Sequence, residues 1–338
     1  MRSATVPARS ILSSRYEEGS RARHVRRVKG ERRRCLDRVL ARIASGEYRL
    51  EEAACPCCGK SEADLVAAFD RYFVPVRIVL CRTCGMVYQA LRPDQESLAR
   101  FYAEEYREMY NPGLRGDVDA YRRGLETPVP VFDKILGWLG ATPGLVFEVG
   151  MHFGALLHMF QERGCRVAGT DFDPAATAFA RDEAGIKAFT GPSTTLLQLN
   201  EQADLLMYVH VLEHINDLDA EFSVMRALVR DGGHLFLSVP GLLHWAQHKG
   251  NDVFCTLQLA HTWYFSLSHL AFIAARHGFR LVHGDDCADA LFVKEEGALA
   301  LALPDEYKRN ADQLRAMHRA WSRARMLGKL RRLFRMKS

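Results

Sequence analysis

Two closely spaced cysteine pairs are the strongest chemical signal in the chain. Cys55 and Cys58 form one C-x-x-C-G segment, Cys81 and Cys84 form a second, and 22 residues separate them. Two such turns can direct four thiolates tetrahedrally around Zn²⁺, and the glycine after each pair suits a tight turn with positive φ. Four protein ligands leave no open position on the metal, so the spacing predicts a structural zinc ribbon. A disulfide pair or unmetallated buried thiols are the alternatives.

A glycine loop with an acidic partner is the second signal. Gly150 and Gly154 follow a buried apolar run that ends in Glu148, and Asp171 ends the next such run, 23 residues after Glu148. A carboxylate at that place can accept hydrogen bonds from both hydroxyls of a ribose. The G-x-G-x-x-G pattern of NAD sites is broken by His152, and the chain has no P-loop. The combination predicts a nucleoside-binding edge, with a purely turn-and-packing role for the glycines as the alternative.

Histidine-rich segments supply candidates for proton transfer and substrate binding. His210, Glu213 and His214 come directly after a later apolar run, and His261 and Tyr264 lie in a further polar and aromatic segment. Histidine accepts a proton near neutral pH, so His214, helped by Glu213 or His261, is the candidate base. His261 and Tyr264 are also candidates for binding hydroxyls of an acceptor. The alternatives are that His214 and Glu213 support a helix start and that the aromatic segment is core.

The elements that must position these residues alternate between strand and helix from Leu145 onward. This alternation predicts an α/β fold with a doubly wound, mostly parallel, seven-stranded sheet. Parallel sheets bind ligands at the carboxyl ends of their strands, where the candidate residues lie. The predicted strands cover 145–150, 165–172, 187–191, 203–212, 234–240, 280–286 and 290–296. The predicted helices cover 155–164, 174–185, 219–233 and 266–279.

Composition excludes several classes of protein. The 338 residues are 48% hydrophobic and 26% charged, which argues against wholesale disorder and against a fibre. No uncharged apolar run is long enough for a membrane span, and no apolar segment near the N-terminus resembles a secretory signal. Nine cysteines, four of them in two tight pairs, favour metal chemistry in a reducing compartment. We therefore expect a cytoplasmic protein.

The positive charge is concentrated at the two ends. Residues 1–50 carry fourteen Lys/Arg and five Asp/Glu, and residues 305–338 carry eleven and three. The part between them has a net charge of −12. Apolar residues recur at near-helical spacing over 313–336, which predicts a basic amphipathic helix. It could dock on the chain's own acidic body or be a plain solvated helix. The alternatives are an anionic membrane surface and nucleic acid.

Four ordered motifs carry a resemblance to a known family. They are EVGMHFG at 148–154, VAGTDFDPAATAFAR at 167–181, DLLMYVHVLEHI at 204–215 and LVRDGGHLFLSVPG at 228–241. Together they resemble the class I S-adenosylmethionine-dependent methyltransferases, with a Rossmann-like sheet. Within this family, the chain most resembles the bacterial small-molecule and sugar methyltransferases that have an LEH segment after the fourth strand.

The resemblance implies a set of cofactor-binding residues. Glu148, Gly150 and Gly154 would line the methionine part of S-adenosylmethionine, and Asp171 would hold the ribose. His152 stands where the family usually has a small residue and narrows the loop. The remaining implied contacts are Phe172 beside the adenine, and Tyr208, Val209 and His210 on the sulfonium side.

Three interpretations of function stay open. The first is a methyltransferase for a small molecule, either a sugar or a glycan or natural-product precursor, with a histidine assisting in-line methyl transfer. The second is a zinc-ribbon RNA methyltransferase, although no Asn-Pro-Pro-Tyr-like motif follows the fourth strand. The third is a scaffold that binds the cofactor without catalysis.

The sequence predicts five segments along the chain. They are a basic tail and helix (1–50), the zinc ribbon (51–90), a helical linker (91–140), the cofactor domain (141–300) and the basic helix (301–338).

Overall fold

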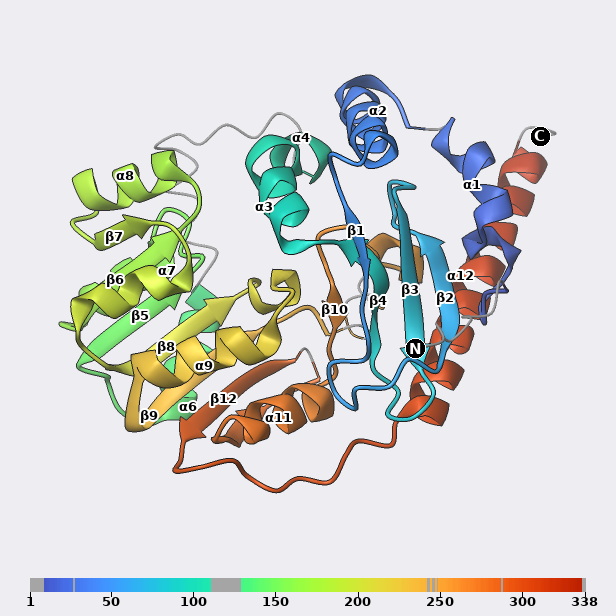
Figure 1. The fold of residues 1–338 in the computed structure, drawn as a ribbon. Helices are drawn as coiled ribbons and strands as arrows, with labels where there is room; N and C mark the ends of the chain where they lie inside the picture. The colour runs from blue at the N-terminus through green and yellow to red at the C-terminus, as the bar shows by residue number, and fades with distance from the viewer. Residues whose placement is uncertain are drawn as a thin grey trace. The chain divides into compact units, whose positions relative to one another are not determined.

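The computed structural model describes residues 9–26, 28–110, 129–241, 249–286 and 288–335, together with residues 244 and 247. The chain divides into two compact units, each assembled from segments that are distant in sequence (Figure 1). Unit 1 comprises Met1–Leu98, Pro240–Ser266 and Leu303–Ser338, and unit 2 comprises Ala99–Val239 and Leu267–Ala302. The expected cofactor domain, 141–300, therefore included a stretch, Pro240–Ser266, that belongs to unit 1.

Unit 2 contains the seven-stranded sheet that the sequence predicts, in the order β11-β12-β9-β8-β5-β6-β7. The five strands from β9 to β7 are parallel, and β11 and β12 are antiparallel to their neighbours. The strands are β5 (Leu145–Val149), β6 (Arg166–Asp171), β7 (Lys187–Thr190), β8 (Ala203–Val209), β9 (Val229–Ser238), β11 (Phe279–Gly284) and β12 (Asp289–Lys294). The doubly wound Rossmann-like architecture is confirmed.

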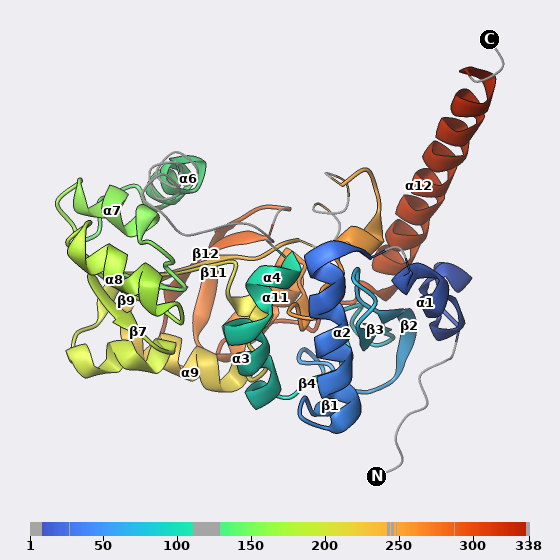
Figure 2. The ribbon, with the colours of Figure 1, turned by 90° about the horizontal axis from the view of Figure 1, so that it is seen from above.

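Helices cover both faces of this sheet. One apolar cluster joins Phe132 of α6 and Phe160 of α7 to Met207 of β8. The next residue along β8, Tyr208, points to the other face, where α9 contacts β8 and β9. Figure 2 shows α6 and α9 on opposite sides of the sheet. The helices of this unit are α4 (Tyr106–Tyr110), α6 (Val129–Leu139), α7 (Ala155–Gln161), α8 (Pro174–Asp182), α9 (Leu218–Leu228) and α11 (Leu267–Arg276), and α3 (Gln95–Glu104) leads into it.

The predicted helix over 219–233 was wrong at its C-terminal end. Helix α9 ends at Leu228, and Val229 is already extended and begins β9. The β-branched Val229 favours a strand, and it pairs with Ala203 before the register shifts. The glycines that were expected to stop the helix instead lie in this irregular start of β9, where Gly232 has a φ of +69°.

Unit 1 is built around a second, antiparallel sheet in the order β1-β4-β3-β2, with β10 also pairing with β4. Its strands are β1 (Leu50–Glu52), β2 (Ala63–Phe69), β3 (Pro75–Cys81), β4 (Val87–Pro93) and β10 (Trp263–Tyr264). Strand β10 comes from a segment about 170 residues further along the chain, and Gln89 of β4 donates hydrogen bonds to its neighbours Gln258, Leu259 and His261. The cysteine segment is thus part of a larger unit than the expected ribbon at 51–90.

The basic C-terminal segment forms one long helix, α12 (Tyr307–Arg335), which is conspicuous in Figure 2. Leu314 and Met317 of its first half are buried in unit 1, whereas Leu327 is 55% exposed. At the N-terminal end of the chain, Tyr16 contacts His318 through its hydroxyl, 3.3 Å from Nδ1. The first half of α12 therefore docks on the chain itself. The other helices of this unit are η1 (Ser14–Tyr16), α1 (Glu18–Val25), α2 (Gly30–Ser45) and η4 (Val253–Thr256).

Among the described residues, no helix combines the length and the apolar character that crossing a membrane requires. Part of the expected helical linker, 111–128, lies outside the described residues.

Candidate functional site

The predicted cofactor residues gather at one edge of the unit 2 sheet. Strands β8, β5 and β6 are parallel neighbours, so their carboxyl ends meet at the same edge. Glu148 lies one residue before the end of β5, Asp171 ends β6 and Val209 ends β8. We call these three strand ends and the loops that follow them the carboxyl edge.

The loop after β5 adopts a tight left-handed path that requires its glycines. Gly150 and Gly154 have φ of +74° and +76°, and His152 between them has φ of +51°. A Cβ atom on Gly150 would lie 2.3 Å from Val211 Cγ2, and one on Gly154 would lie 2.5 Å from Ile186 Cδ1. Positive φ at a non-glycine residue is costly and is often found at functional sites, and His152 shows it here. His152 stands where a small residue was expected, and the loop still adopts its tight turn.

Asp171 ties this loop to the next strand. One carboxylate oxygen accepts a hydrogen bond from the backbone N–H of His152, and the other accepts one from the N–H of Asp173, each at 2.8 Å. An ionised carboxylate has about four lone-pair sites, so acceptor capacity is left for a ligand. The neighbouring Phe172 ring is 72% exposed, which is unusual for a phenylalanine. A carboxylate beside an exposed ring suits a ribose and a purine.

Glu148 is buried beside Asp171 without being paired. Its side chain is 4% exposed, and Oε2 has no hydrogen-bond partner within the described part of the chain. Burial, assisted by the negative charge of Asp171, raises the pKa of Glu148 to about 8. An unpaired buried acceptor at a ligand-binding edge fits an ammonium group supplied by a ligand.

This burial predicts a pH-dependent stability that a Glu148→Gln variant should lose. The folded pKa of about 8 exceeds the ordinary value of 4.5, so the contribution of Glu148 to stability is complete below pH 4.5 and is lost as the pH rises through 8. Between pH 4.5 and pH 8 and above, we expect the free energy of unfolding of the ligand-free wild type to fall by roughly 3–5 kcal/mol more than that of the variant. Urea unfolding at each pH measures this free energy. An exposed control, Glu183→Gln, should behave like the wild type. Parallel stability curves for Glu148→Gln and the wild type would contradict the burial argument.

A buried glutamate lies between two histidines where β8 ends. Glu213 is 1% exposed in a short helical turn, η3 (Leu212–His214). Its Oε1 lies 3.6 Å from His210 Nδ1 and 3.8 Å from His214 Nε2. Burial disfavours a charged His210, but the negative charges of the nearby Glu213 and of Asp289 outweigh this effect and raise the pKa of His210. His210 also has a positive φ of +56°, so this backbone is constrained as well. The position of His210, Glu213 and His214 directly after β8, at the carboxyl edge, agrees with the position predicted from the sequence.

Sequence reasoning missed a group of tyrosines that packs against His214. The ring centroids of Tyr102 and Tyr106 lie 5.3 Å and 6.2 Å from that of His214, and the two tyrosine rings stack at 4.7 Å. Tyr110 continues the row at 4.9 Å from Tyr106. Burial raises the pKa of Tyr102, and its hydroxyl has no hydrogen-bond partner among the described residues. The recurrence of tyrosine at every fourth position was the available signal.

Two further predicted residues lie on opposite sides of their strand. The Tyr208 side chain is fully buried and its hydroxyl donates to Glu221 of α9, so it faces the helix layer. Val209 is partly buried and packs against the apolar cluster on the other face. A contribution of Tyr208 to a cofactor site would come from its backbone.

His261 and Tyr264 lie in unit 1, both buried, at 7% and 4% exposure. The Tyr264 hydroxyl accepts a hydrogen bond from Gln258 N at 3.2 Å, and its backbone pairs with Val87 in β4. This tyrosine therefore holds its own segment together. The acceptor-binding role of both residues stays a prediction of the sequence.

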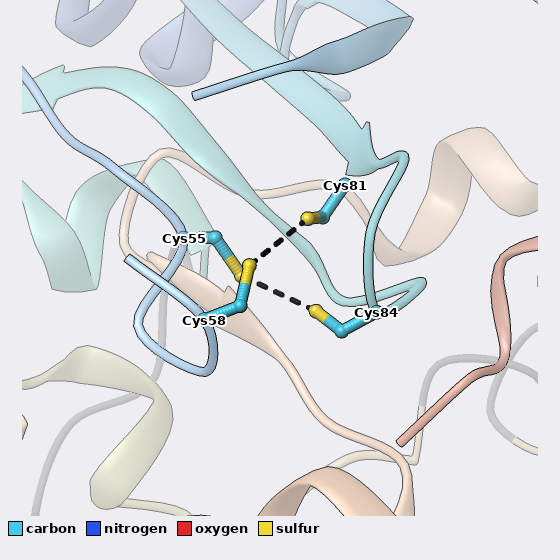
Figure 3. Close-up of side chains that lie close together, drawn as sticks. All are labelled: Cys55, Cys58, Cys81 and Cys84. Atoms are coloured by element: carbon cyan, nitrogen blue, oxygen red, sulfur yellow. Dashed lines mark hydrogen bonds between the residues drawn. The ribbon is translucent and has the colours of Figure 1, made fainter. Parts of the chain in front are cut away.

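The four predicted zinc ligands converge in unit 1, as Figure 3 shows. The sulfur atoms of Cys55 and Cys84 lie 3.4 Å apart, those of Cys58 and Cys81 lie 3.5 Å apart, and all four lie within 4.8 Å of one another. Thiolates at about 2.3 Å from a tetrahedral zinc ion have sulfur atoms roughly 3.8 Å apart. The arrangement therefore has the size that a zinc ion requires.

Comparisons with known proteins agree on one kind of domain. Residues 122–284 match a family model described as a methyltransferase domain. The C-methyltransferase NovU of Streptomyces niveus is 29% identical over 235 residues, which cover 67% of this chain and 52% of that protein. The chain thus spans about half the length of this curated relative.

Solved structures with partial similarity include two further methyltransferases. Magnesium protoporphyrin IX methyltransferase of Synechocystis aligns with a TM-score of 0.42 and 18% identity, over 60% of this chain and 100% of that one. An amino pentose methyltransferase of Micromonospora echinaspora aligns with a TM-score of 0.39 and 15% identity, over 54% and 99%. With the four motifs and the matching family model, the chain carries a class I S-adenosylmethionine-dependent methyltransferase domain.

Proposed function

We propose that this protein transfers a methyl group from S-adenosylmethionine to a small molecule of the sugar or natural-product class. The observation that carries the proposal is Glu213, buried between His210 and His214 at the same carboxyl edge as the glycine loop. This edge combines a nucleoside-binding carboxylate with groups that can take up a proton. The relative from Streptomyces niveus is named a C-methyltransferase, which supports methyl transfer and adds a carbon atom to the candidate acceptors.

The residues of the carboxyl edge fit the cofactor. Asp171 would accept hydrogen bonds from the ribose hydroxyls, and Phe172 offers an exposed ring to the adenine. Glu148 would pair with the amino group, and Gly150 and Gly154 would allow the backbone to approach closely. The roles of His152, Val209 and the backbone of Tyr208 beside the methionine part belong to the same proposal. When bound, S-adenosylmethionine supplies an electrophilic methyl group.

His214 is the candidate base of this site. Glu213 raises the pKa of the neighbouring His210 and so favours its protonated form. In this proposal His214 accepts a proton from the acceptor, with Glu213 on one side of its ring and Tyr102 and Tyr106 on the other. Removing a proton from a hydroxyl or a carbon acid is the task that methyl transfer leaves to the protein.

Label transfer tests this function. The purified full chain is incubated with methyl-labelled S-adenosylmethionine and a panel of free and activated sugars, with RNA as a separate arm. Label in a sugar supports the proposal. Label in RNA, or cofactor binding without transfer to any acceptor, would favour the RNA methyltransferase or the non-catalytic scaffold.

We further propose that Cys55, Cys58, Cys81 and Cys84 hold a structural zinc ion. A Cys₄ set closes the coordination sphere, so the metal would brace unit 1 and take no part in chemistry. Strand β3 ends in Cys81 and carries one knuckle, and the loop between β1 and β2 carries the other. Binding free energy at such a site is folding free energy.

Removal of this metal should destabilise unit 1. We expect about one zinc per chain by elemental analysis of the wild type, and a Cys58→Ala variant should lose the metal and melt roughly 5 °C or more lower. Cys35→Ala is the matched control, since Cys35 is a buried cysteine of α2 in unit 1 and lies outside the four-cysteine set. Zinc-free wild-type protein, or equal metal loss in both variants, would show that the cluster is not a zinc site.

A further inference from the structure

Unit 1 contains a cavity that the proposed methyl transfer does not use. Its volume is about 640 Å³, within the range of small-molecule sites. Four parts of the chain form it: η1, the turn between β2 and β3, the segment leading into η4, and α12. Its lining residues are Arg15, Arg71, Tyr72, Phe73, Lys249, Asp252, Phe254, Cys255, Trp321 and Arg325.

The charges around this cavity are strongly unbalanced. Arg15, Arg71, Lys249 and Arg325 face a single carboxylate, Asp252, so the lining carries a net charge of +3. Arg15 lies 3.3 Å from Asp252, which balances one of the four. The other three cations reach the cavity from three different segments, so their donors can meet one ligand from several sides.

The docking of α12 does not account for these cations. Leu314 and Met317 provide its buried contacts, His318 meets Tyr16, and Arg15 lies 3.9 Å over the Trp321 ring. Arg325 is one turn beyond Trp321, at 5.1 Å from the same ring, and its side chain is exposed. The helix could therefore dock without a cation at that position.

The turn that presents Arg71 is held rigidly. Asp70 is fully buried, and its carboxylate accepts hydrogen bonds from the N–H groups of Tyr72 and Val74 and from that of Leu259. Phe73 in this turn has a positive φ of +71°, a conformation that needs such support. A second positive φ, +62° at Asn251, lies between the lining residues Lys249 and Asp252. Two of the segments that line the cavity are therefore constrained, as in a preformed binding site.

The Arg71 side chain is itself anchored at one end. Its Nη1 donates to the carbonyl of Cys255 at 3.1 Å, and its backbone N–H donates to that of Leu257 at 2.8 Å. These bonds fix the guanidinium in the lining of the cavity, and a guanidinium has five N–H donors. An anchored guanidinium loses little conformational entropy when it binds an anion.

We propose that this cavity is a second ligand site and binds a phosphorylated small molecule. A phosphate group carries close to two negative charges and three acceptor oxygens, which match guanidinium and ammonium donors converging from separate segments. The rings of Tyr72, Phe73 and Phe254 provide an apolar wall for the organic part. All of these residues belong to unit 1, and the proposal does not depend on methyl transfer.

Calorimetric titration of the full chain with inorganic pyrophosphate tests this site. We expect saturable binding that weakens as sodium chloride is added, because salt screens these contacts. Removing two cations from the rim in a Lys249→Ala/Arg325→Ala variant should weaken the affinity about 10–100-fold. Both side chains are exposed, so the variant should keep its fold. The matched control is Lys308→Ala/Arg323→Ala, which removes two exposed cations of α12 outside the cavity and should bind like the wild type.

A second readout locates the ligand. Cys255 is a partly buried thiol in the cavity wall, so bound pyrophosphate should slow its alkylation, followed peptide by peptide in mass spectra. Equal weakening in both double variants, or no protection of Cys255, would overturn the proposal. Preferential binding of vesicles containing anionic lipid, or of RNA, that depends on Lys249 and Arg325 would also overturn it in favour of a macromolecular surface. Loss of methyl transfer would leave these binding results unaffected.

Discussion

Replacement of Asp171 by alanine should lower the affinity for S-adenosylmethionine by roughly 10²–10⁴-fold, because hydrogen bonds to a charged group contribute about 1.5–3 kcal/mol each. Two such bonds to ribose hydroxyls are expected. The same carboxylate also orders the glycine loop through the N–H of His152. Equilibrium dialysis with labelled cofactor, or calorimetry, measures the change directly.

Further variants separate the contribution of Asp171 to cofactor binding from its contribution to the structure of the glycine loop. Asp171→Asn keeps the shape of the side chain but turns one acceptor into a donor, so it should bind the cofactor more weakly than the wild type and more tightly than Asp171→Ala. Asp182→Ala removes an exposed carboxylate from α8 and should leave cofactor affinity unchanged. Thermal melting shows whether each variant is folded. A folded Asp171→Ala protein with wild-type affinity would remove the nucleoside-binding assignment of the carboxyl edge.

Local sequence patterns were sufficient for the sheet of unit 2. Its central strands are short apolar runs between helices of regular spacing, so each strand could be placed by its own residues. The error at Val229–Gly233 has a local cause, since glycines after a helical pattern usually mark its end. Here the chain turns directly into β9, and pairing with Ala203 decides the outcome.

Pairings between distant segments could not be predicted in the same way. Strand β10 has two residues, and its partner Tyr88 is 175 positions away from Trp263, so neither turn length nor periodicity points to it. The segment around His261 consequently looked like a loop of the sheet domain. Its backbone is instead bound to Gln89 of unit 1.

The candidate site was predictable in its residues and less so in their surroundings. Motif order placed Glu213 and His214 after β8, where the structure has them. The burial of Glu213 and the tyrosines beside His214 depend on how α3 and α4 pack, which no local pattern encodes. The position of Glu213 between His210 and His214 could be derived only from the structure.

Substitution of His214 by alanine should lower the turnover number roughly 10²–10⁴-fold, the usual contribution of a positioned general base, and leave the cofactor affinity within about twofold. The reason is that His214 contacts Glu213 and two tyrosine rings, whereas the predicted contacts to the ribose, the adenine and the amino group lie on the β5 and β6 loops. Glu213→Gln should lower turnover less, because it removes orientation and charge while the imidazole stays in place. His283→Ala, an exposed histidine of β11, is the matched control.

Two further measurements separate catalysis from support of the fold. A general base acts only on the proton-transfer step, so His214→Ala should lower the turnover number while its thermal melting stays like that of the wild type. Glu213→Gln should lower the pKa of His210, because it removes a negative charge that raises this pKa, and NMR titration of the imidazole measures the change. If His214→Ala lost cofactor affinity and thermal stability as strongly as turnover, His214 would be a packing residue. The proton would then have to leave through another group of the carboxyl edge, with His210 the next residue to replace.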